Sequence, residues 1–435
     1  MNFSLYPSNS ILASSQEIPP MSNITIIKNA HILNPPYQDV HGPCDIVIEG
    51  EYIKEIAERP VAMDGARLID VQGRTVMPGL IDLHVHTNAV EVNLGKQSSM
   101  PNALVTLRSA GLMSAMLRRG FTTVRDAGGA GDPMKQAVQM GLIQGPRLFV
   151  SGRALSQTGG HGDMRGRSDF LAASECACCV RAGALARVAD GVDAVRRAVR
   201  EEFQMGADQI KIMASGGVAS PTDPIGAIGY SEEEIRAIVD EAQRQGSYVL
   251  AHAYTAQAIT RAVNFGVRTI EHGNLVDSAA AAAMAKQGAY AVPTLVTYDA
   301  LATEGEQYGL GPESLEKLLR VRDAGLGSLE IFKAAGVKMG FGSDLLGPSQ
   351  RLQSEEFRLR RQVQSAAEVL TSATSIGAEV LDMRDRLGLL AANAWADLLV
   401  VDGNPLRDIG CLLGQGEKIP LVMKAGVVEF NTLGG

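Results

Sequence analysis

Two histidines separated by one residue end an apolar stretch near the start of the chain, in Met77-Pro-Gly-Leu-Ile-Asp-Leu-His84-Val-His86. In an extended segment, side chains two residues apart point to the same side, so both imidazoles are aimed at one point. Imidazole nitrogens are common ligands of transition metals. A single pair of this kind is more often a hydrogen-bonded surface feature than a metal site, so the rest of the chain must decide between the two interpretations.

Further residues that could take part in a metal centre recur at the ends of later apolar stretches. They are Lys211, His252, His272 and Asp344, and with the first pair they place four of the seven histidines at predicted strand ends. Any one of these histidines could be a core or surface residue with ordinary hydrogen bonds, but the set of six favours a metal centre. Neutral imidazoles and a carboxylate suit zinc and also accept manganese, cobalt or iron.

Lys211 differs from the other five because an ammonium group cannot bind a cation. It lies between Ile210 and Ile212, where burial would lower its pKa and free the amine. A neutral amine that captured carbon dioxide would become a carbamate, whose two oxygens could bridge two metal ions. The alternatives are a lysine that pairs with an acidic side chain and a lysine that binds substrate directly.

The segments that must position these residues alternate between strands and helices. Strand-like segments are predicted at 75–83, 122–126, 147–151, 209–213, 248–252, 267–272, 289–294 and 337–344. Helical spacing fills the intervals, for example at 103–119, and a capping box from Ser231 to Glu234 opens another helix. Eight strand–helix units predict an α/β fold, a (β/α)8 TIM barrel, in which the carboxyl ends of the strands share one face. A doubly wound sheet is the rival, but no Gly-x-Gly-x-x-Gly follows the first strand.

Both ends of the chain alternate apolar with polar residues, as half-buried antiparallel strands do. We therefore predict one small β-sandwich domain built from residues 21–76 and 385–435, beside a metal-dependent barrel at residues 77–384. Residues 1–20 are predicted to be a disordered leader. The sequence leaves open whether Met1 or Met21 is the start.

The composition limits the classes of partner and the compartment. The chain has 435 residues, 46% of them hydrophobic, and a net charge of −8, which argues against nucleic acid or an anionic membrane as partner. There is no apolar run of the roughly 20 residues that a membrane span needs, and the first 20 residues lack the pattern of a signal peptide. Cys176, Cys178 and Cys179 are too close together for a disulfide framework, so a reducing, cytoplasmic location is expected.

The motifs taken together resemble the amidohydrolase superfamily. The resemblance rests on two segments, from Pro78 to His86 and from Ala394 to Leu406, and on four residues within short motifs. These are Lys211 in Ile-Lys-Ile-Met, His252 in Ala-His-Ala, His272 in Glu-His-Gly and Asp344 in Phe-Gly-Ser-Asp. The stretches from Ser156 to Asp163 and from Met213 to Val218 are similar to the branch that contains prolidase-like dipeptidases and ochratoxin-degrading amidases. The resemblance covers residues 21 to about 430.

The resemblance implies a binuclear site, most simply with two zinc ions. The implied ligands of the more buried metal are His84, His86 and Asp344; those of the other are His252 and His272; N6-carboxylated Lys211 would bridge the two. A metal-bridging hydroxide would be the nucleophile, since metal binding lowers the pKa of water toward about 7. Asp344 would accept its proton and pass it to the leaving amine.

Three further residues are expected to bind substrate. His161, in a glycine-rich loop, is assigned to stabilising the carbonyl oxygen of the tetrahedral intermediate, with hydrogen bonding within the loop as the alternative. Tyr230 could bind a substrate carboxylate, although ordinary packing explains it equally well. Val218 is apolar and leaves room for a bulky acyl group.

The implied reaction is hydrolysis of an amide bond to an amino acid with a free carboxylate. The substrate would be an Xaa-Pro-type dipeptide or an N-acyl amino acid such as ochratoxin A. The alternatives are a cyclic-amide or lactone hydrolase, and a mononuclear deaminase of the same fold, which needs no bridging lysine. A non-enzymatic scaffold is disfavoured because all six ligand positions are filled. Large barrels of this superfamily commonly assemble symmetrically, so a homo-oligomer is expected.

Overall fold

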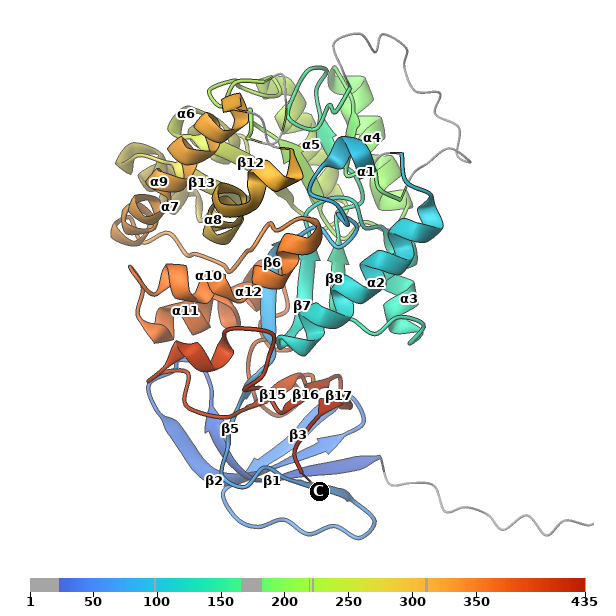
Figure 1. The fold of residues 1–435 in the computed structure, drawn as a ribbon, viewed down its shortest axis with the longest axis vertical. Coiled ribbons are helices and arrows are strands. Elements are labelled where there is room, and N and C mark those ends of the chain that lie inside the picture. Colours follow the sequence, from blue (N-terminus) through green and yellow to red (C-terminus); the bar gives the residue numbers. More distant parts are fainter. Residues whose placement is uncertain are drawn as a thin grey trace, which may run out of the picture.

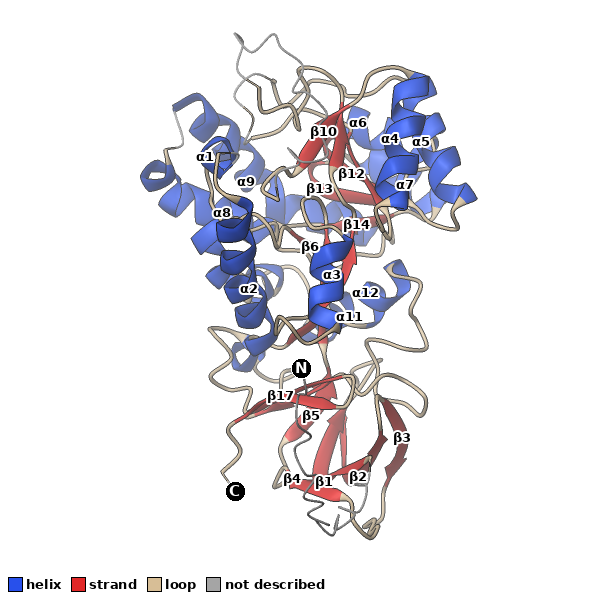
Figure 2. Ribbon diagram, turned by 90° about the vertical axis from the view of Figure 1, so that its right-hand side faces the viewer, coloured by secondary structure: helices blue, strands red, loops and turns tan. Residues whose placement is uncertain are grey.

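The computed structural model describes residues 23–97, 99–165, 182–218, 220, 223–309 and 312–434. A larger part, in which helices surround strands, lies above a smaller part made of strands (Figures 1 and 2). The predicted leader at 1–20 and the cysteines Cys176, Cys178 and Cys179 lie outside the described residues.

Strands from both ends of the chain form one eight-stranded sheet in the smaller part. They are β1 (Ile24–Leu33), β2 (Val40–Glu49), β3 (Tyr52–Ala57), β4 (Arg67–Asp70), β5 (Thr75–Pro78), β15 (Leu398–Val401), β16 (Leu421–Lys424) and β17 (Val427–Asn431). The order is β17-β16-β15-β5-β1-β2-β3, with β4 paired to β1. The sheet is mixed and not purely antiparallel, because β1 is antiparallel to β2 but parallel to β4 and β5. The ladder is continuous, so the two-sheet sandwich stays a prediction, as do its residue limits.

Both faces of this terminal sheet are covered at β2. Ile46 and Ile48 belong to a buried cluster that also holds Leu398 of β15, whereas Val47 belongs to a second cluster with Ile26. Successive side chains on a strand point to opposite faces, so these two clusters lie on opposite sides of the sheet. The strand is therefore more completely buried than the half-buried pattern predicted.

The strands of the larger part are parallel and form two hydrogen-bonded sheets. The first holds β6 (Leu80–Val85), β7 (Phe121–Asp126) and β8 (Arg147–Val150), and the second holds β9 (Ala154–Ser156), β10 (Ala186–Val188), β11 (Ile210–Met213), β12 (Val249–Thr255), β13 (Thr269–Leu275) and β14 (Tyr290–Val292). Their neighbours along the chain are mostly helices, as the alternating pattern predicts.

The helices of the larger part are α1 (Leu94–Gln97), α2 (Asn102–Arg118), α3 (Asp132–Gln139), α4 (Val192–Gln204), α5 (Glu232–Arg244), α6 (Ala256–Asn264), α7 (Ser278–Gln287), α8 (Leu295–Glu304), α9 (Pro312–Ala334), α10 (Glu355–Arg360), α11 (Ala366–Ser372) and α12 (Ser375–Val380). Short 3-10 helices span Gly305–Tyr308, Gly347–Leu352 and Ile409–Leu412. The predicted capping box opens α5: Glu234 N donates to Ser231 Oγ and Ser231 N donates to the Glu234 carboxylate. Among the described helices, none combines the length and the apolar character that a membrane crossing requires.

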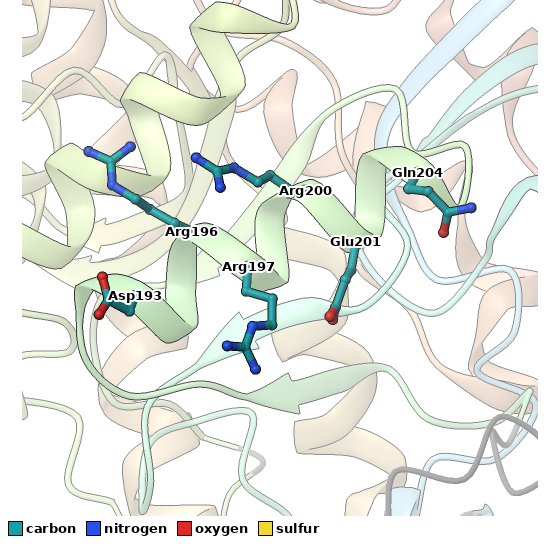
Figure 3. Close-up of a pocket in the computed structure, with 6 residues that line it drawn as sticks. All are labelled: Asp193, Arg196, Arg197, Arg200, Glu201 and Gln204. Carbon is teal, nitrogen blue, oxygen red and sulfur yellow. The ribbon is translucent and has the colours of Figure 1, made fainter.

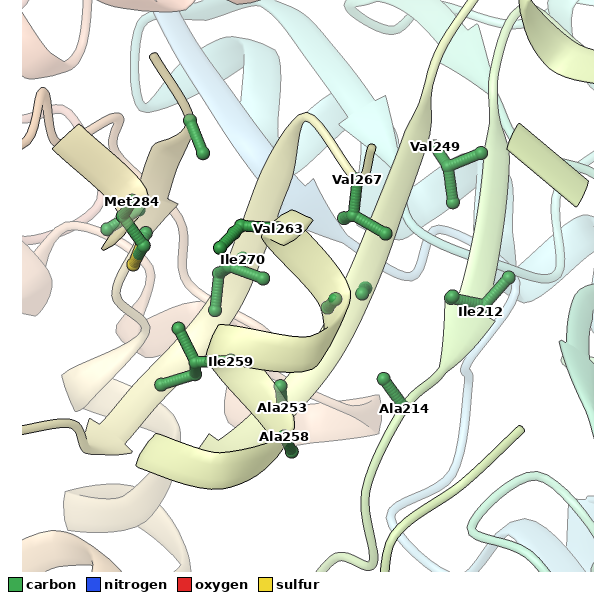
Figure 4. Close-up of a cluster of buried hydrophobic side chains, with 14 of the residues drawn as sticks. Ile212, Ala214, Val249, Ala253, Ala258, Ile259, Val263, Val267, Ile270 and Met284 are labelled. Atoms are coloured by element: carbon green, nitrogen blue, oxygen red, sulfur yellow. The ribbon is translucent and has the colours of Figure 1, made fainter. Parts of the chain in front are cut away.

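An apolar cluster joins the second sheet to its helices (Figure 4). Ile212 and Ile270 come from the strands, and Ile259 and Val263 of α6 pack against them with Met284 of α7. Burying one such side chain contributes about 1.5–3 kcal/mol. The cluster therefore fixes β11, β12 and β13, which carry three of the predicted ligands.

The first predicted strand, 75–83, is divided at Gly79. Its first half is β5 of the terminal sheet and its second half is β6 of the parallel sheet. A Cβ at Gly79 would lie only 2.1 Å from Thr122 Oγ1, so a residue without a side chain is needed for this close approach. The chain passes between the two parts of the molecule at this glycine.

The eighth predicted strand, 337–344, is not a regular strand. It carries one isolated parallel bridge, between Met339 and Ala291 of β14. Its other side faces β6, because Leu83 N donates to Phe341 O at 2.8 Å and Asp344 N donates to His84 O at 2.8 Å. The segment thus connects β14 to β6, although no continuous closed ladder runs through the described strands.

Three phenylalanines pack together at this segment. The Phe341 ring centroid lies 4.6 Å from that of Phe357 and 5.5 Å from that of Phe121, and all three side chains are fully buried. Replacing Phe357 with alanine is expected to lower the free energy of unfolding by about 3–5 kcal/mol, because a large cavity remains. Denaturant titration would measure the loss, with Leu107→Ala, at a side chain that is 73% exposed, expected within about 0.5 kcal/mol of wild type. Similar losses in both variants would contradict this assignment of the core.

Candidate metal centre and active site

The structure brings His84, His86, His272 and Asp344 together from three distant segments. The Nε2 atoms of His84 and His86 lie 3.3 and 3.2 Å from Asp344 Oδ1, and His272 Nδ1 lies 3.9 Å from Asp344 Oδ2. One possible ligand atom from each of His84, His272 and Asp344 lies within 4.8 Å of the other two. This grouping has the residue types and spacing of a metal site.

His252 and His161 extend the same group of rings. The His252 ring centroid lies 4.7 Å from that of His272, and His161 stacks on His252 at 4.4 Å with an interplanar angle of 23°. His84 lies 5.0 Å from His272 on the other side. All five histidines predicted for the site are therefore contiguous.

Each of the four histidines proposed as ligands has one ring nitrogen hydrogen bonded to the protein. The contacts are His84 Nδ1 to Glu271 Oε2 at 2.7 Å, His86 Nδ1 to Gly128 O at 2.7 Å, His272 Nδ1 to Thr294 Oγ1 at 2.8 Å, and His252 Nε2 to Gly216 O at 3.1 Å. Hydrogen bonds of this kind fix the tautomer and the orientation of a metal-binding imidazole. The second nitrogen of each ring is left for a ligand.

This donor set fits a cation. Nδ1 of His84 and Nδ1 of His86 are bonded to acceptors behind the rings, so both Nε2 atoms face the Asp344 carboxylate. A ring nitrogen and a carboxylate oxygen 3.2–3.3 Å apart need a proton or a cation between them. Burial opposes the charged form of Asp344, but the neighbouring histidines hold the pKa of its carboxyl well below the usual range. A divalent metal ion satisfies all of these groups at once.

Lys211 lies on β11 and is 2% exposed. Burial lowers the pKa of its ammonium to about 8, with Glu271 and Asp344 acting in the opposite direction and Arg125 in the same one. Among the described residues, no carboxylate lies within ion-pair distance of it, so the alternative of a simple ion pair is not what the structure shows. The amine therefore has the environment that carbamate formation needs.

Glu271 is a site residue that the sequence did not reveal. It accepts from His84 Nδ1, from Arg125 Nη2 at 2.8 Å and from Thr269 Oγ1 at 2.5 Å, and both Glu271 and Arg125 are fully buried. The Arg125 guanidinium also donates to Leu83 O at 2.6 Å. This buried pair holds the His84 ring from behind.

An unusual backbone conformation explains why the adjacent residues Glu271 and His272 both reach the site. His272 has a φ of 72°, in the left-handed region that residues other than glycine rarely occupy, and Asp344 has a φ of 51° in the same region. Adjacent residues of a strand normally point to opposite faces, yet both Glu271 and His272 contact the His84 ring. Such local strain is found at functional sites, where the surrounding structure maintains it.

Replacing Glu271 with glutamine is expected to weaken metal binding about 10- to 100-fold, because the amide no longer matches both His84 Nδ1–H and the Arg125 guanidinium. Competition against a coloured chelator would measure the affinity. Glu232→Gln, at an exposed carboxylate that pairs with Arg236, serves as the control and should leave the affinity unchanged. Equal affinities in the two variants would show that Glu271 does not support the centre.

The predicted substrate residues Tyr230 and Val218 lie in different surroundings. Tyr230 is 1% exposed and packs in the apolar cluster that contains Ile235 and Ile238 of α5. Its hydroxyl has no hydrogen-bond partner among the described residues. Its role in binding substrate stays a prediction.

Val218 packs beside two tyrosines that the sequence did not single out. It shares a buried cluster with Tyr254 and Tyr298, whose hydroxyls are hydrogen bonded at 3.1 Å. The Tyr254 ring lies 4.7 Å from that of His252 and 5.4 Å from that of His272. The histidine group thus has an apolar and aromatic side. Tyr254 follows His252 by two residues, which is the signal that could have identified it.

A separate surface cavity of 490 Å³ follows α4 (Figure 3). It is lined by Asp193, Arg196, Arg197, Arg200, Glu201 and Gln204. Arg196 and Arg200 both bind the Glu241 carboxylate, at 2.6 and 2.7 Å. The cavity includes none of the predicted site residues, and we assign it no role.

Comparison with known proteins places this site in a family. Residues 75–428 match the Amidohydrolase family, and the chain belongs to that family. Ochratoxinase from Aspergillus niger is 33% identical over 350 residues, which cover 77% of this chain and 71% of the relative. Its solved structure aligns with a TM-score of 0.83 and 27% identity over 96% of this chain and 98% of that one.

Two solved structures are more similar still. One, described as an amidohydrolase, aligns with a TM-score of 0.93 and 64% identity over 94% of this chain and 100% of that one. The other, a prolidase in complex with N-methylphosphonate-L-proline, gives 0.91 and 56% over 93% and 99%. The predicted branch of prolidase-like dipeptidases and ochratoxin-degrading amidases is confirmed. The protein is a hydrolase that acts on C–N bonds, and the likeness of its parallel strands to these structures implies a TIM barrel.

Proposed function

We propose that the protein is a binuclear metal-dependent amidohydrolase that cleaves an amide bond to a carboxylate-bearing amino acid. Xaa-Pro-type dipeptides and N-acyl amino acids such as ochratoxin A are the proposed substrate classes. The observation that carries the proposal is the convergence of His84 Nε2 and His86 Nε2 on Asp344, beside His272. The proline-type ligand of the similar prolidase and the name of the similar ochratoxinase support the substrate classes.

The proposed metal ions are divalent, with zinc as the first candidate. His84, His86 and Asp344 would hold one ion, His252 and His272 the other, and N6-carboxylated Lys211 would lie between them. When bound, such a pair supplies an activated water molecule and polarises the scissile carbonyl group.

The side chains of the protein then move the protons. Asp344 accepts a proton from the attacking water and returns it to the amide nitrogen as the C–N bond breaks. One water and one amide give one carboxylic acid and one amine, so the proposed reaction is balanced without another reactant. His161 is proposed to stabilise the negative charge on the carbonyl oxygen, and Glu271 keeps the His84 ring in place.

The proposal extends to the fold and its setting. Residues 77–384 are proposed to form a closed (β/α)8 barrel, supported by the backbone hydrogen bonds of segment 337–344 to both β14 and β6. The terminal sheet, from residues 21–76 and 385–435, is proposed to fold as a β-sandwich. The homo-oligomeric state, the cytoplasmic location and the lack of nucleic-acid and membrane partners rest on the sequence alone.

A panel of dipeptides and N-acyl amino acids tests the proposal. The purified protein, supplied with zinc and bicarbonate, is incubated with each compound, and mass spectrometry follows the release of free amino acids. Release from one subset, and its loss in Asp344→Asn, is the expected result. If no member releases an amino acid while both metals are bound, the reaction belongs to cyclic amides, lactones or deamination. Release of ammonia alone would indicate a deaminase.

A further inference from the structure

One buried carboxylate connects the two chain segments that carry His84 and Asp344. Asp82 lies on β6, two residues before His84, and its side chain is fully buried. Its Oδ1 accepts from His84 N at 3.0 Å and from Ser343 N at 3.3 Å. Its Oδ2 accepts from Ser343 Oγ at 2.6 Å and from Gln353 Nε2 at 2.9 Å. Since Ser343 directly precedes Asp344, the carboxylate holds the backbone at one proposed ligand and beside another.

These hydrogen bonds replace one that regular strand pairing would supply. Leu83 N donates to the facing segment, and a regular parallel ladder would continue with Ser343 N donating to Leu83 O. Leu83 O instead accepts from Arg125 Nε at 2.6 Å. Ser343 N is shared between Asp82 Oδ1 and His84 O, both at 3.3 Å. A buried N–H group without an acceptor is costly, so Asp82 supplies an acceptor where the chain leaves the regular pairing.

Gln353 and Arg119 fix the Asp82 carboxylate from its other side. A guanidinium only donates, so Gln353 Oε1 is the acceptor for Arg119 Nε at 3.2 Å and for Nη2 at 2.9 Å. The amide nitrogen of Gln353 is then the end that donates to Asp82. Arg119 is held in turn by Gln415, whose Oε1 accepts from Nη1 at 3.1 Å. Gln353 and Arg119 are both buried, so the carboxylate has a fixed position of its own.

We propose that Asp82 is a positioning residue for the metal centre, which sets the separation of the His84 ring and the Asp344 carboxylate. Asp344 adopts its positive φ directly after Ser343, and its own N–H donates to His84 O at 2.8 Å. The backbone that carries both side chains is therefore anchored at Asp82. This role rests on the proposed metal-dependent hydrolysis. Both oxygens of Asp82 are occupied by donors, so its effect passes through the two ligands.

Cobalt binding to the full-length protein tests this role without turnover. Protein freed of metal by a chelator is titrated with Co²⁺ in the presence of bicarbonate, and the visible absorption reports the arrangement of the ligands. Asp82→Asn keeps the shape of the side chain but offers one oxygen in place of two, so one pair of donors loses its acceptor. The variant is expected to bind Co²⁺ about 10- to 100-fold more weakly and with an altered absorption spectrum.

Asp45→Asn is the matched control. Asp45 is a buried carboxylate of the terminal sheet that accepts from Asn29 N and Val61 N and pairs with Lys28. Its replacement removes the same kind of buried acceptor at a distance from the proposed ligands. The variant should be less stable than wild type but should bind Co²⁺ with the wild-type affinity and spectrum.

Ser343→Ala is a milder change that keeps the test decisive if Asp82→Asn does not fold. It removes the hydroxyl that donates to Asp82 and is expected to lower the Co²⁺ affinity about 10-fold. In the zinc-loaded protein, kcat on the best substrate of the panel should also fall about 10-fold, with KM changed less than about threefold. Ser109→Ala, at a buried serine whose hydroxyl donates within α2, should change none of these values.

Wild-type cobalt spectra and affinities in both Asp82→Asn and Ser343→Ala would overturn the positioning role, even in a protein that hydrolyses amides. An equal change in Asp45→Asn would overturn it as well. If wild type hydrolyses no amide but the two site variants alter the cobalt spectrum, the proposed reaction fails while the role of Asp82 stands. A wild type that binds no cobalt would overturn both.

Discussion

Replacing Lys211 with alanine is expected to lower kcat at least about 1000-fold, equivalent to about 4 kcal/mol of transition-state stabilisation, and to reduce the bound metal. The reason is the loss of the carbamate that is proposed to form on Lys211 of β11 and to lie between the two proposed metal positions. Steady-state kinetics and metal analysis of the zinc-supplemented protein measure the two effects. Lys135→Ala, at a partly exposed lysine that pairs with Asp208, is the matched control and should leave both unchanged.

The same lysine makes the centre depend on carbon dioxide and pH. With a pKa of about 8, about half of the Lys211 amines are neutral at pH 8, compared with less than about 1% for an ordinary lysine. Carbamate formation on metal-free protein should therefore increase as the pH rises toward 8, which 13C-labelled bicarbonate would reveal by NMR. Full activity and full metal content in Lys211→Ala would exclude the binuclear scheme and favour a mononuclear deaminase.

Replacing Asp344 with asparagine is expected to lower kcat by about 10²- to 10⁴-fold. The amide keeps the shape of the carboxylate, but it neither accepts a proton from water nor returns one to the leaving nitrogen. The measurement is kcat on the best substrate, together with the affinity for the amino-acid product. That affinity should change little, since the product does not need the proton transfer. Asp402→Asn, at a carboxylate that is 46% exposed, provides the control.

Retention of more than about a tenth of the activity in Asp344→Asn would contradict its role as the proton carrier. A loss of both activity and bound metal would show instead that Asp344 acts mainly as a ligand. The two results are separated by measuring the zinc content of each preparation before the kinetics.

The grouping of the site histidines with Asp344 could be predicted because each of these residues follows an apolar segment. The pattern that ends at His84, His252, His272 and Asp344 repeats along the chain, and parallel strands bring their carboxyl ends together. The division of the first strand at Gly79 escaped prediction because an apolar run gives no sign of which sheet its two halves join. The close approach of Gly79 to Thr122, which leaves no room for a side chain at position 79, is visible only in the structure.

The pairing that supports the His84 ring could not be predicted because its members are distant in the chain. Glu271 and Arg125 are 146 positions apart, and no local spacing marks such a pair. Glu271 also precedes His272, so simple strand alternation would point it away from the site. The positive φ of His272 removes that alternation, and a sequence pattern does not record it.

The origin of the ligands in segments from position 84 to position 344 has a consequence for biosynthesis. A ribosome that has released the chain only as far as β14 exposes His84, His86, His252 and His272 without Asp344, whose carboxylate faces the first two and His272. β5 likewise lacks its neighbour β15 until residues 398–401 have emerged. Tight binding at the proposed metal centre is therefore expected only of the finished polypeptide, so that metal content would report whether a given molecule was synthesised and folded to completion.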